Sequence, residues 1–388
     1  MGFSSNDQII SALSNGQTFK SSWGKLFNPT TAAVANEWHT LFRGGGNPPA
    51  DAIFNAGSAL AFQPVKDSTT SAASIPHGGN VQPTYTKHLI SGSAVTAAAT
   101  VVPGTLALVD VVGFYRLTAV TTTTAQSTTN TLGQSDTFTA DAGTDVITFT
   151  STANIPSNLL LGTRMRFTTT TTLPAGISLA TDYYYVPVTT GTGKLATSYA
   201  NAVAGTTIDI TDTGTGTHTA TWLLPRYTNG AGLDAIFFNS NATPLGAATP
   251  NLSIGYTNSS QASSRATPTV LPVGKTAASN SLILYSGSGA GKYNYAVPRQ
   301  AGDAGIAQID SIQNATSYVS GEYSVALVKE IARFPLSTLG LAAERNLMFE
   351  YPSMPRIYDG AALYWLYGSG VATPANSAFS GDLNFAWN

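Results

Sequence analysis

Hydrophobic residues near the N-terminus recur mostly every three or four positions, the spacing that is typical of an amphipathic helix. In residues 5–27 a serine and an asparagine that can cap a helix precede the run, whose hydrophobic positions are Ile9, Ile10, Leu13, Phe19, Trp23, Leu26 and Phe27. A second run has Val34, Trp38, Leu41 and Phe42 at the same spacing. It ends at the glycine- and proline-rich residues 44–49, so the pattern predicts short helices over residues 5–27 and 31–42.

Residues 1–48 are therefore predicted to form a short helical N-terminal arm in front of a β-rich chain. The aromatic side chains of such an arm need a partner surface, because exposed rings are unfavourable in water. The candidate interface residues are Trp23, Phe27, Trp38 and Phe42. We expect them to anchor the arm on its own domain or on a neighbouring subunit, and deletion of residues 1–45 to abolish attachment while the β core stays folded.

Strand patterns dominate the rest of the chain. Residues 105–115 are almost continuously apolar, as in a strand buried on both faces, and residues 233–238 form a shorter run of the same kind. Further strand patterns cover residues 281–285, 324–331, 347–351 and 361–367, with glycine, proline and asparagine between them. Leu383, Phe385 and Trp387 alternate to the end and predict a paired terminal strand. Short strands separated by such turn-forming residues predict an all-β, antiparallel, jelly-roll-like sandwich.

A second group of strands interrupts the first. Residues 121–131 consist mostly of threonine, serine, alanine and glutamine and read as an exposed linker. Strand patterns follow at residues 137–149, 164–172, 182–188, 206–211 and 218–222. Because loop tips tolerate insertions, the simplest organisation is a small β-domain, residues 121–222, inserted into a discontinuous β-sandwich core of residues 49–120 and 223–388.

Charge is scarce in this chain of 388 residues. Charged residues make up 10%, against about 25% in an average protein, whereas the hydrophobic share of 43% is ordinary. A weakly charged surface is typical of subunits that neighbours partly cover, so the composition favours assembly over catalysis. A net charge of −2 gives no field that would attract nucleic acid. Without cysteine, disulfides, thiol catalysis and cysteine-ligated zinc are excluded.

The N-terminus gives no targeting signal. Residues 1–7 lack a basic patch followed by an apolar stretch, and the chain has no apolar run of about 18 residues. We therefore expect synthesis in a cytoplasm and no membrane partner.

Residues 136–222 resemble a small β module that recurs in structural proteins of tailed bacteriophages. The stretches that carry this resemblance are residues 172–186, 194–198 and 208–218. The remainder also resembles virion structural proteins of phages, at residues 77–80, 86–89, 102–110, 224–232 and 359–363. The resemblance implies a location in a particle and implies no chemistry.

One segment is superficially similar to a phosphate-binding loop. Residues 287–293 read Gly-Ser-Gly-Ala-Gly-Lys-Tyr. The spacing to Gly291 and Lys292 is one residue short, and Tyr293 stands where a magnesium-binding serine or threonine is needed. We therefore favour a plain glycine-rich loop and expect no cofactor.

Metal-binding residues are few. The histidines are His39, His77, His88 and His218. His77 and His88 could meet across a loop, yet no acidic pattern completes a metal set, so we favour histidines satisfied by loop or interface neighbours. Asp209 and Asp212 could bind calcium weakly, but their spacing lacks the alternation of an EF-hand loop, and turn carboxylates are the simpler interpretation. No metal site is predicted.

Aromatic clusters allow two interpretations. The clusters are Tyr183–Tyr185, Tyr293 with Tyr295, and Tyr364, Trp365 and Tyr367. They could form a carbohydrate-binding platform, or they could fill the core and reach the edges of interfaces; we favour the second because strands select aromatic residues. A glycoside hydrolase would need two carboxylates across a groove. Asp359 precedes a glycine, and a turn there accounts for the aspartate without catalysis. Neither Glu344 nor Asp359 belongs to an acidic cluster, so no catalytic residue is predicted.

These observations predict a structural component of a phage virion, most simply a capsid decoration or minor capsid protein that stabilises the particle through subunit contacts. The expected partners are copies of the chain, as a trimer or another symmetric oligomer, and other virion proteins. A tail or receptor-binding protein that adheres to host glycans is the alternative. A major capsid protein is less favoured, since its usual fold has a long charged helix, and an enzyme comes last.

Overall fold

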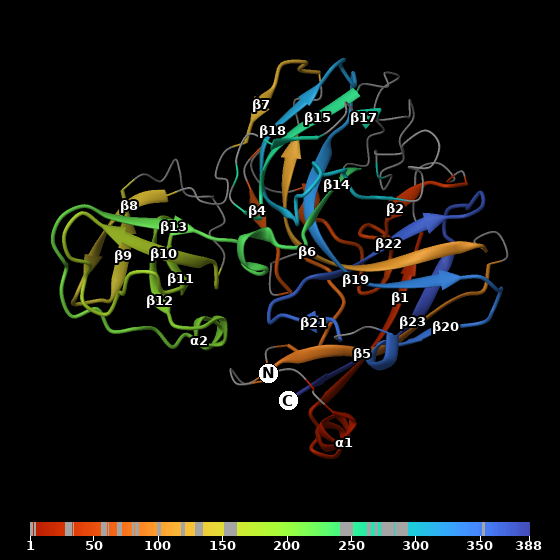
Figure 1. The fold of residues 1–388 in the computed structure, drawn as a ribbon, viewed down its shortest axis with the longest axis horizontal. Coiled ribbons are helices and arrows are strands. Elements are labelled where there is room, and N and C mark those ends of the chain that lie inside the picture. The colour runs from red at the N-terminus through yellow and green to blue at the C-terminus, as the bar shows by residue number, and fades with distance from the viewer. Residues whose placement is uncertain are drawn as a thin grey trace.

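The computed structural model describes residues 3, 5–27, 33, 35–55, 60, 62–67, 72–79, 81, 85–98, 102–117, 121–128, 135–150, 161–240, 251–260, 262, 265–267, 271–272, 283, 294–350 and 354–388. The regular secondary structure consists mostly of antiparallel strands, arranged as three sheets in one core and a closed barrel beside it (Figure 1). The predicted all-β sandwich class is confirmed.

A central sheet of long strands forms the middle of the core. Its order is β14-β19-β6-β22-β2, and β4 also pairs with β6. The strands are β2 Trp38–Thr40, β4 Gln63–Pro64, β6 Gly104–Leu117, β14 Asp234–Asn239, β19 Tyr323–Leu336 and β22 Leu363–Ser369. As the apolar run predicts, every residue from Leu106 to Tyr115 in β6 is buried.

Two further sheets pack on the central sheet. The terminal sheet, which contains the first and last strands, has the order β20-β5-β23-β1-β3, with β21 paired to β5. Its strands are β1 Thr18–Leu26, β3 Gly46–Asn47, β5 Lys87–Thr96, β20 Ala343–Asn346, β21 Arg356–Ile357 and β23 Ala378–Trp387. The upper sheet has the order β16-β15-β18-β7, with β17 paired to β15. Its strands are β7 Gln126–Ser127, β15 Asn251–Asn258, β16 Arg265–Ala266, β17 Leu271–Pro272 and β18 Ile306–Asn314.

The two outer sheets share one face of the central sheet. Leu108 of β6 belongs to the hydrophobic cluster with the terminal sheet, and Tyr115 of the same strand belongs to the cluster with the upper sheet. Strands β6 and β19 therefore run through both clusters. Because side chains alternate between faces, Val109 lies in a third cluster on the opposite face, with Phe42 and Phe54 from the segments that cover it.

The N-terminal region is a helix followed by a strand, and the predicted helical arm is wrong beyond residue 14. Helix α1 covers Asn6–Ser14, with Ser5 as its N-cap. Strand β1 then pairs along its whole length with β23 in the terminal sheet. The misreading has a physical cause: Phe19, Trp23 and Phe27 are four residues apart, and an even spacing also places side chains on one face of a strand.

The second predicted helix, residues 31–42, is also wrong where the structure describes it. Residues 38–40 form β2, which pairs with β22 at the edge of the central sheet. Val34 lies outside the described residues. The spacing of four between Trp38 and Phe42 is again compatible with extended backbone.

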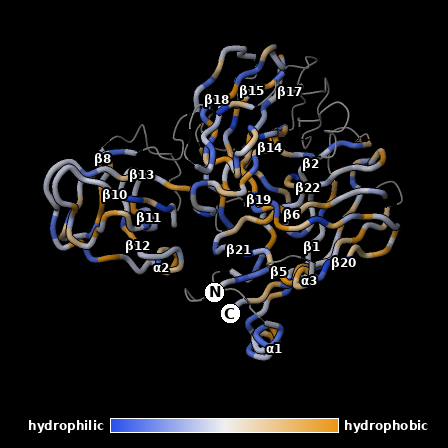
Figure 2. Tube along the Cα trace, in the orientation of Figure 1, coloured by the Kyte–Doolittle hydropathy of each residue, from blue (hydrophilic) through white to orange (hydrophobic). Residues whose placement is uncertain are grey.

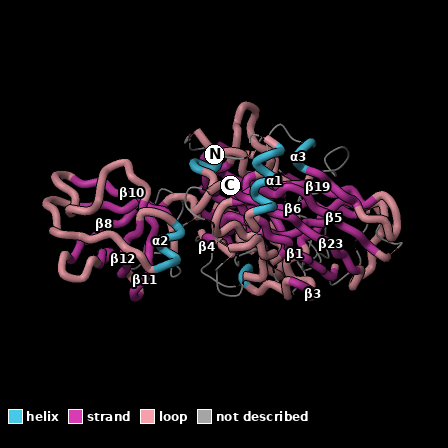
Figure 3. The backbone as a smooth tube through the Cα atoms, turned by 90° about the horizontal axis from the view of Figure 1, so that it is seen from below, coloured by secondary structure: helices cyan, strands magenta, loops and turns pink. Residues whose placement is uncertain are grey.

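A closed barrel stands beside the three-sheet core (Figures 1 and 3). Its order is β10-β11-β12-β9-β8-β13. The strands are β8 Ser135–Asp141, β9 Val146–Phe149, β10 Arg164–Thr169, β11 Tyr183–Thr189, β12 Thr192–Ala196 and β13 His218–Trp222. Helix α2, Tyr199–Ala204, lies between β12 and β13. The barrel has its own hydrophobic cluster, which includes Phe138, Phe167 and Trp222.

Part of the exposed linker predicted over residues 121–131 is a strand of the core. Gln126–Ser127 form β7, an edge strand of the upper sheet that pairs with β18. The Thr128 hydroxyl donates to the carbonyl of Ile309 at 2.5 Å. This part of the chain therefore belongs to the core, because a polar sequence suits an edge strand that faces water on one side.

The remaining elements are short, namely helix α3 Leu347–Glu350 and the 3₁₀ turns η1 Ile53–Asn55 and η3 Thr228–Gly230. Hydrophobic and hydrophilic positions alternate along many of the strands (Figure 2), as half-buried sheets require. Of the helices in the described part of the chain, none combines the length and hydropathy needed to cross a membrane.

Candidate functional site

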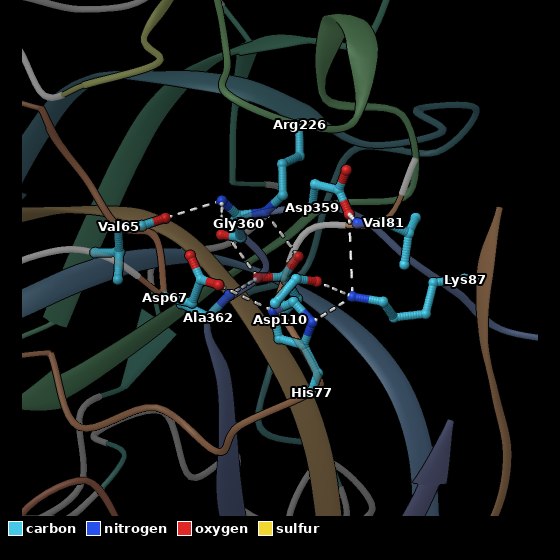
Figure 4. A network of polar contacts seen from close by, with 11 residues as sticks. Val65, Asp67, His77, Val81, Lys87, Asp110, Arg226, Asp359, Gly360 and Ala362 are labelled. Atoms are coloured by element: carbon cyan, nitrogen blue, oxygen red, sulfur yellow. Dashed lines mark hydrogen bonds and ion pairs between the residues drawn. The ribbon is translucent and has the colours of Figure 1, made fainter. Parts of the chain in front are cut away.

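A buried ion pair links strand β6 to the segment that follows the barrel (Figure 4). Asp110 lies in the middle of β6, and Arg226 reaches it from the segment between the barrel and β14. Arg226 Nη2 lies 2.7 Å from Asp110 Oδ1, and Nε lies 2.8 Å from Oδ2. Burial alone would lower the pKa of Arg226, and the Asp110 carboxylate outweighs burial and raises it.

All hydrogen-bonding groups of this pair are occupied. Arg226 also donates to the carbonyls of Val65 and Gly360, each at 2.9 Å, and of Val111 at 2.8 Å. Asp110 accepts further bonds from the Ala362 amide and the Tyr227 hydroxyl. Because a guanidinium has five N–H donors, none is left for a ligand. The pair therefore holds the fold together.

A second polar group lies next to the first (Figure 4). Lys87 Nζ lies 2.9 Å from His77 Nδ1 and 4.0 Å from Asp359 Oδ1, and it donates to the carbonyl of Gly79. His77 Nε2 lies 3.4 Å from Asp67 Oδ2. Burial lowers the pKa of Lys87 to about 8, and Asp359 and Asp67 oppose this effect. Burial also raises the pKa of Asp359, opposed by Lys87.

The structure places the histidines in separate environments. His77 contacts Lys87, whereas His88 Nδ1 lies 3.1 Å from the carbonyl oxygen of Met354. His39 lies beside Glu37, and His218 Nδ1 lies 2.9 Å from the Thr169 hydroxyl. All of them are buried. Within the described ranges no three metal-binding side chains converge.

Of the acidic pair Asp209 and Asp212, the second stabilises a turn of the barrel. Asp212 Oδ1 accepts hydrogen bonds from the amides of Ala175 and Gly214, at 2.8 and 2.9 Å. These bonds lower the pKa of Asp212, since they stabilise the charged form. The phosphate-loop-like residues 287–293 lie outside the described residues.

The four candidate interface residues are buried within their own chain, which is the first of the two alternatives expected for them, own domain or neighbouring subunit. Trp23, Phe27, Trp38 and Phe42 are between 0% and 7% exposed. Trp23 lies against Trp365, with ring centroids 4.5 Å apart, and the other three also contact buried aromatic rings. A side chain that its own chain covers cannot bind a neighbouring subunit.

The other aromatic clusters follow the core interpretation with one exception. Tyr183 and Tyr185 fill the barrel, and Tyr295, Tyr364, Trp365 and Tyr367 fill the sandwich. Tyr184 lies between the two barrel tyrosines and is only half-buried, because alternate residues of a strand point to opposite faces. Its outward direction places it at the junction with the core.

A pocket of about 190 Å³ lies at this junction. The barrel contributes Tyr184, Ser198, Tyr199 and Ala200. The core contributes Val81, Tyr85, Thr86, Lys87, Pro225, Arg226, Arg356, Ile357, Tyr358 and Asp359. Sequence reasoning missed this pocket, since its lining comes from five segments, far apart in the sequence, that only the fold brings together.

The barrel is held against the core next to the pocket. Lys66 Nζ from the core donates to the carbonyl of Leu161 at 2.5 Å, and it lies 5.1 Å from the ring centroid of Tyr199. Burial, and to a smaller extent Arg226, lowers the pKa of Lys66 well below its ordinary value. A β-carbon at Gly360 would lie 2.8 Å from the Tyr199 ring, so glycine allows this close contact.

Comparison with known proteins gives no relative at the level of sequence: no family model and no curated protein matches the chain. Among solved structures, one similar chain is from T=1 particles derived from infectious bursal virus, at 8% identity, covering 95% of this chain and 77% of that one, with a TM-score of 0.15. Another is from the unassembled VP1 pentamer of KI polyomavirus, at 13% identity, covering 96% and 94%, with a TM-score of 0.16. TM-scores this low carry no argument about this chain.

Proposed function

We propose that this chain is a structural component of a phage virion, most simply a capsid decoration or minor capsid protein. The observation that carries the proposal is the agreement between sequence resemblance and fold. The residues that resemble a module of tailed-phage structural proteins are 136–222, and the closed barrel runs from Ser135 to Trp222. The resemblance therefore follows a folded unit rather than an arbitrary piece of sequence.

The polar groups of the core support a structural role. Arg226 and Asp110 are saturated by hydrogen bonds within the chain. His77, which has a lysine and a carboxylate as neighbours, is only 1% exposed, so a substrate has no access to its ring. Reactive side chains need contact with their substrate, and these contact the fold instead.

Hydrophobic side chains on the surface give candidate contacts for neighbouring subunits. Ile10 and Leu13 on α1 are 59% and 54% exposed, and Leu339 and Leu341 between β19 and β20 are 49% and 64% exposed. With a formal net charge of only −2, attraction between copies would depend on such apolar area and on hydrogen bonds. Assembly should therefore persist in high salt, which screens charge but not apolar contact.

The position of the chain in a particle tests the proposal. Purified particles are labelled with antibodies against residues 136–222 and imaged by electron microscopy. Label over the capsid surface supports a decoration or minor capsid protein. Label confined to the tail tip supports the receptor-binding alternative, and particles without label contradict both.

A receptor-binding protein remains the second candidate because of one observation. The junction pocket presents Tyr184 from the barrel, and tyrosine rings suit the recognition of saccharides. Adsorption of the purified chain to host cells tests this second candidate, and the position of the label in the particle separates it from the first.

A further inference from the structure

Tyrosine rings line the junction pocket from both sides. Tyr184 of β11 and Tyr199 of α2 come from the barrel, whereas Tyr85 precedes β5 and Tyr358 follows β21 in the core. Tyr85 is exposed and the other three are half-buried, so hydroxyl groups and ring surface remain near the pocket. Saccharides bind to such surfaces because a sugar presents C–H groups to a ring and hydroxyls to polar groups.

The pocket also has an excess of positive charge. Its cations are Lys87, Arg226 and Arg356, and Asp359 is its carboxylate. Arg226 is neutralised from behind by Asp110, and Lys87 lies 4.0 Å from Asp359. Among the described residues, Arg356 is then the cation of the pocket lining that has no carboxylate paired with it.

Arg356 is placed to bind an anion. It is exposed, and its guanidinium carbon lies 4.3 Å from the ring centroid of Tyr358. It forms no ion pair with any residue in the described part of the chain. A guanidinium that a ring orients can donate two parallel hydrogen bonds to a carboxylate.

We propose that the junction pocket binds a saccharide that carries a carboxylate, with its sugar ring against Tyr184 and Tyr199 and its carboxylate on Arg356. A free inorganic anion would contact Arg356 but would not pack against the tyrosine rings. A neutral sugar would pack against the rings but would bring no negative charge to pair with Arg356.

This inference goes beyond the proposed structural function and does not depend on it. The pocket lining comes partly from the barrel and partly from the core, so a bound saccharide would contact both. A particle protein with such a site would bind acidic glycans at the surface of a host cell. Assembly and glycan binding are measured separately, so the failure of one leaves the other standing.

The test measures binding of the full chain to a panel of oligosaccharides, with calorimetry or ligand-observed NMR as the method. The acidic probes contain galacturonate, glucuronate, sialate or muramate, and each has a neutral counterpart of the same length. Inorganic sulfate is the probe for a bare anion. We expect at least one acidic probe to bind about tenfold more tightly than its neutral counterpart, because the ion pair with Arg356 is only partly exposed to water once the sugar covers it.

Variants assign the binding to this pocket. Arg356→Gln should weaken the acidic probe about tenfold and abolish the preference over the neutral one. Lys20→Gln is the matched control, since it also removes one positive charge but lies outside the pocket lining. Tyr184→Ala should weaken binding about tenfold, whereas Tyr184→Phe keeps the ring and should retain most of it.

Several results would overturn the proposal. One is the absence of binding by every acidic probe up to about 10 mM. Others are equal binding of acidic and neutral probes, sulfate binding as tight as that of the best saccharide, and unchanged binding in Arg356→Gln. Circular dichroism of each variant establishes that loss of binding is not loss of fold.

Discussion

At the scale of single residues, the pair of Arg226 and Asp110 sets the strongest constraint. Both side chains are almost fully buried, at 2% and 0% exposed. Burial of two charges is unfavourable unless each is paired and hydrogen-bonded, and here both conditions hold. The pair lies between the hydrophobic clusters that β6 and β19 share, so its loss would affect both.

Replacement of Arg226 should therefore destabilise the chain strongly. Arg226→Met leaves Asp110 buried without its partner and should lower the free energy of unfolding by about 3–5 kcal/mol. The measurement is urea unfolding followed by circular dichroism. Arg116→Met is the matched control, because Arg116 pairs with Glu322 in a partly exposed position, and it should cost about 1 kcal/mol or less. Equal effects of the two variants would contradict the assigned role.

Lys87 predicts how stability depends on pH. Burial lowers its pKa from 10.5 to about 8, so between these values the unfolded chain binds more protons at this site than the folded chain. The free energy of unfolding should therefore rise with pH from about 8. Above about pH 10 buried tyrosines act in the opposite direction, since burial raises the pKa of Tyr367 to about 12 and unfolded tyrosines ionise first.

The corresponding variant is Lys87→Met. It should reduce the slope of unfolding free energy between pH 8 and 10 by about 1 kcal/mol per pH unit, because one titrating group is removed. Lys20→Met on the exposed face of β1 is the control and should keep the slope. The measurement is urea unfolding at a series of pH values. An unchanged slope in Lys87→Met would show that other groups produce the rise.

At the scale of elements, β1 is the clearest case of a segment whose role differs from its sequence pattern. It lies between β23 and β3 in the terminal sheet and is not an appendage. Its nine residues pair with β23, and Trp23 packs against Trp365 of the central sheet. A strand inside a sheet contributes hydrogen bonds on two sides, so its removal exposes two neighbours.

Two truncations separate α1 from the sheet. Deletion of residues 1–15 removes α1 with its buried Ile9 and should cost only about 2–3 kcal/mol, leaving a cooperative unfolding transition. Deletion of residues 1–45 also removes β1 and β2 and should abolish that transition, in contrast to the expectation from sequence. Thermal unfolding measured by circular dichroism distinguishes them. A cooperative transition in the longer deletion would mean that β1 is dispensable.

The barrel should fold by itself. Its strands close on one another, and its cluster of buried residues is separate from those of the core. We expect a fragment of residues 135–222 to give dispersed amide NMR signals and a cooperative thermal transition. Phe167→Ala, in the barrel centre, should lower its unfolding free energy by about 3–5 kcal/mol. A fragment with the spectrum of an unfolded chain would indicate that contacts such as that of Lys66 with Leu161 are required.

At the scale of the whole molecule, the exposed side chains of α1 replace the buried aromatic residues as candidate contacts for neighbouring subunits. Ile10→Ser with Leu13→Ser should leave stability within about 0.5 kcal/mol, since both side chains are exposed. The same variant should reduce self-association or particle binding, as measured by light scattering and co-sedimentation in low and high salt. Leu179→Ser, on the barrel, is the control for lost surface hydrophobicity. Full association by the α1 variant would exclude this helix as a contact.

The sequence predicts those parts of the fold in which a pattern has only one structural meaning. The continuous apolar run of β6 and the short strands around Trp222 belong to this group. A spacing of four residues fits one face of a helix and one face of a strand, so it predicts a helix at Trp23 and Phe27 where the structure has a strand and the residue after it. Asp110 within an apolar run was the available signal for a buried ion pair. Nothing along the chain connects Tyr184 with Arg356, because their proximity depends on how the barrel meets the core.

The closure of the barrel has a consequence for crowding. A sheet with free borders offers a row of unsatisfied amides and carbonyls on which another copy can polymerise. In the barrel β8 and β10 both pair with β13, so the ring of six strands leaves no such border. Many copies can thus stand close together at very high local concentration with little tendency to form cross-β fibres through this unit.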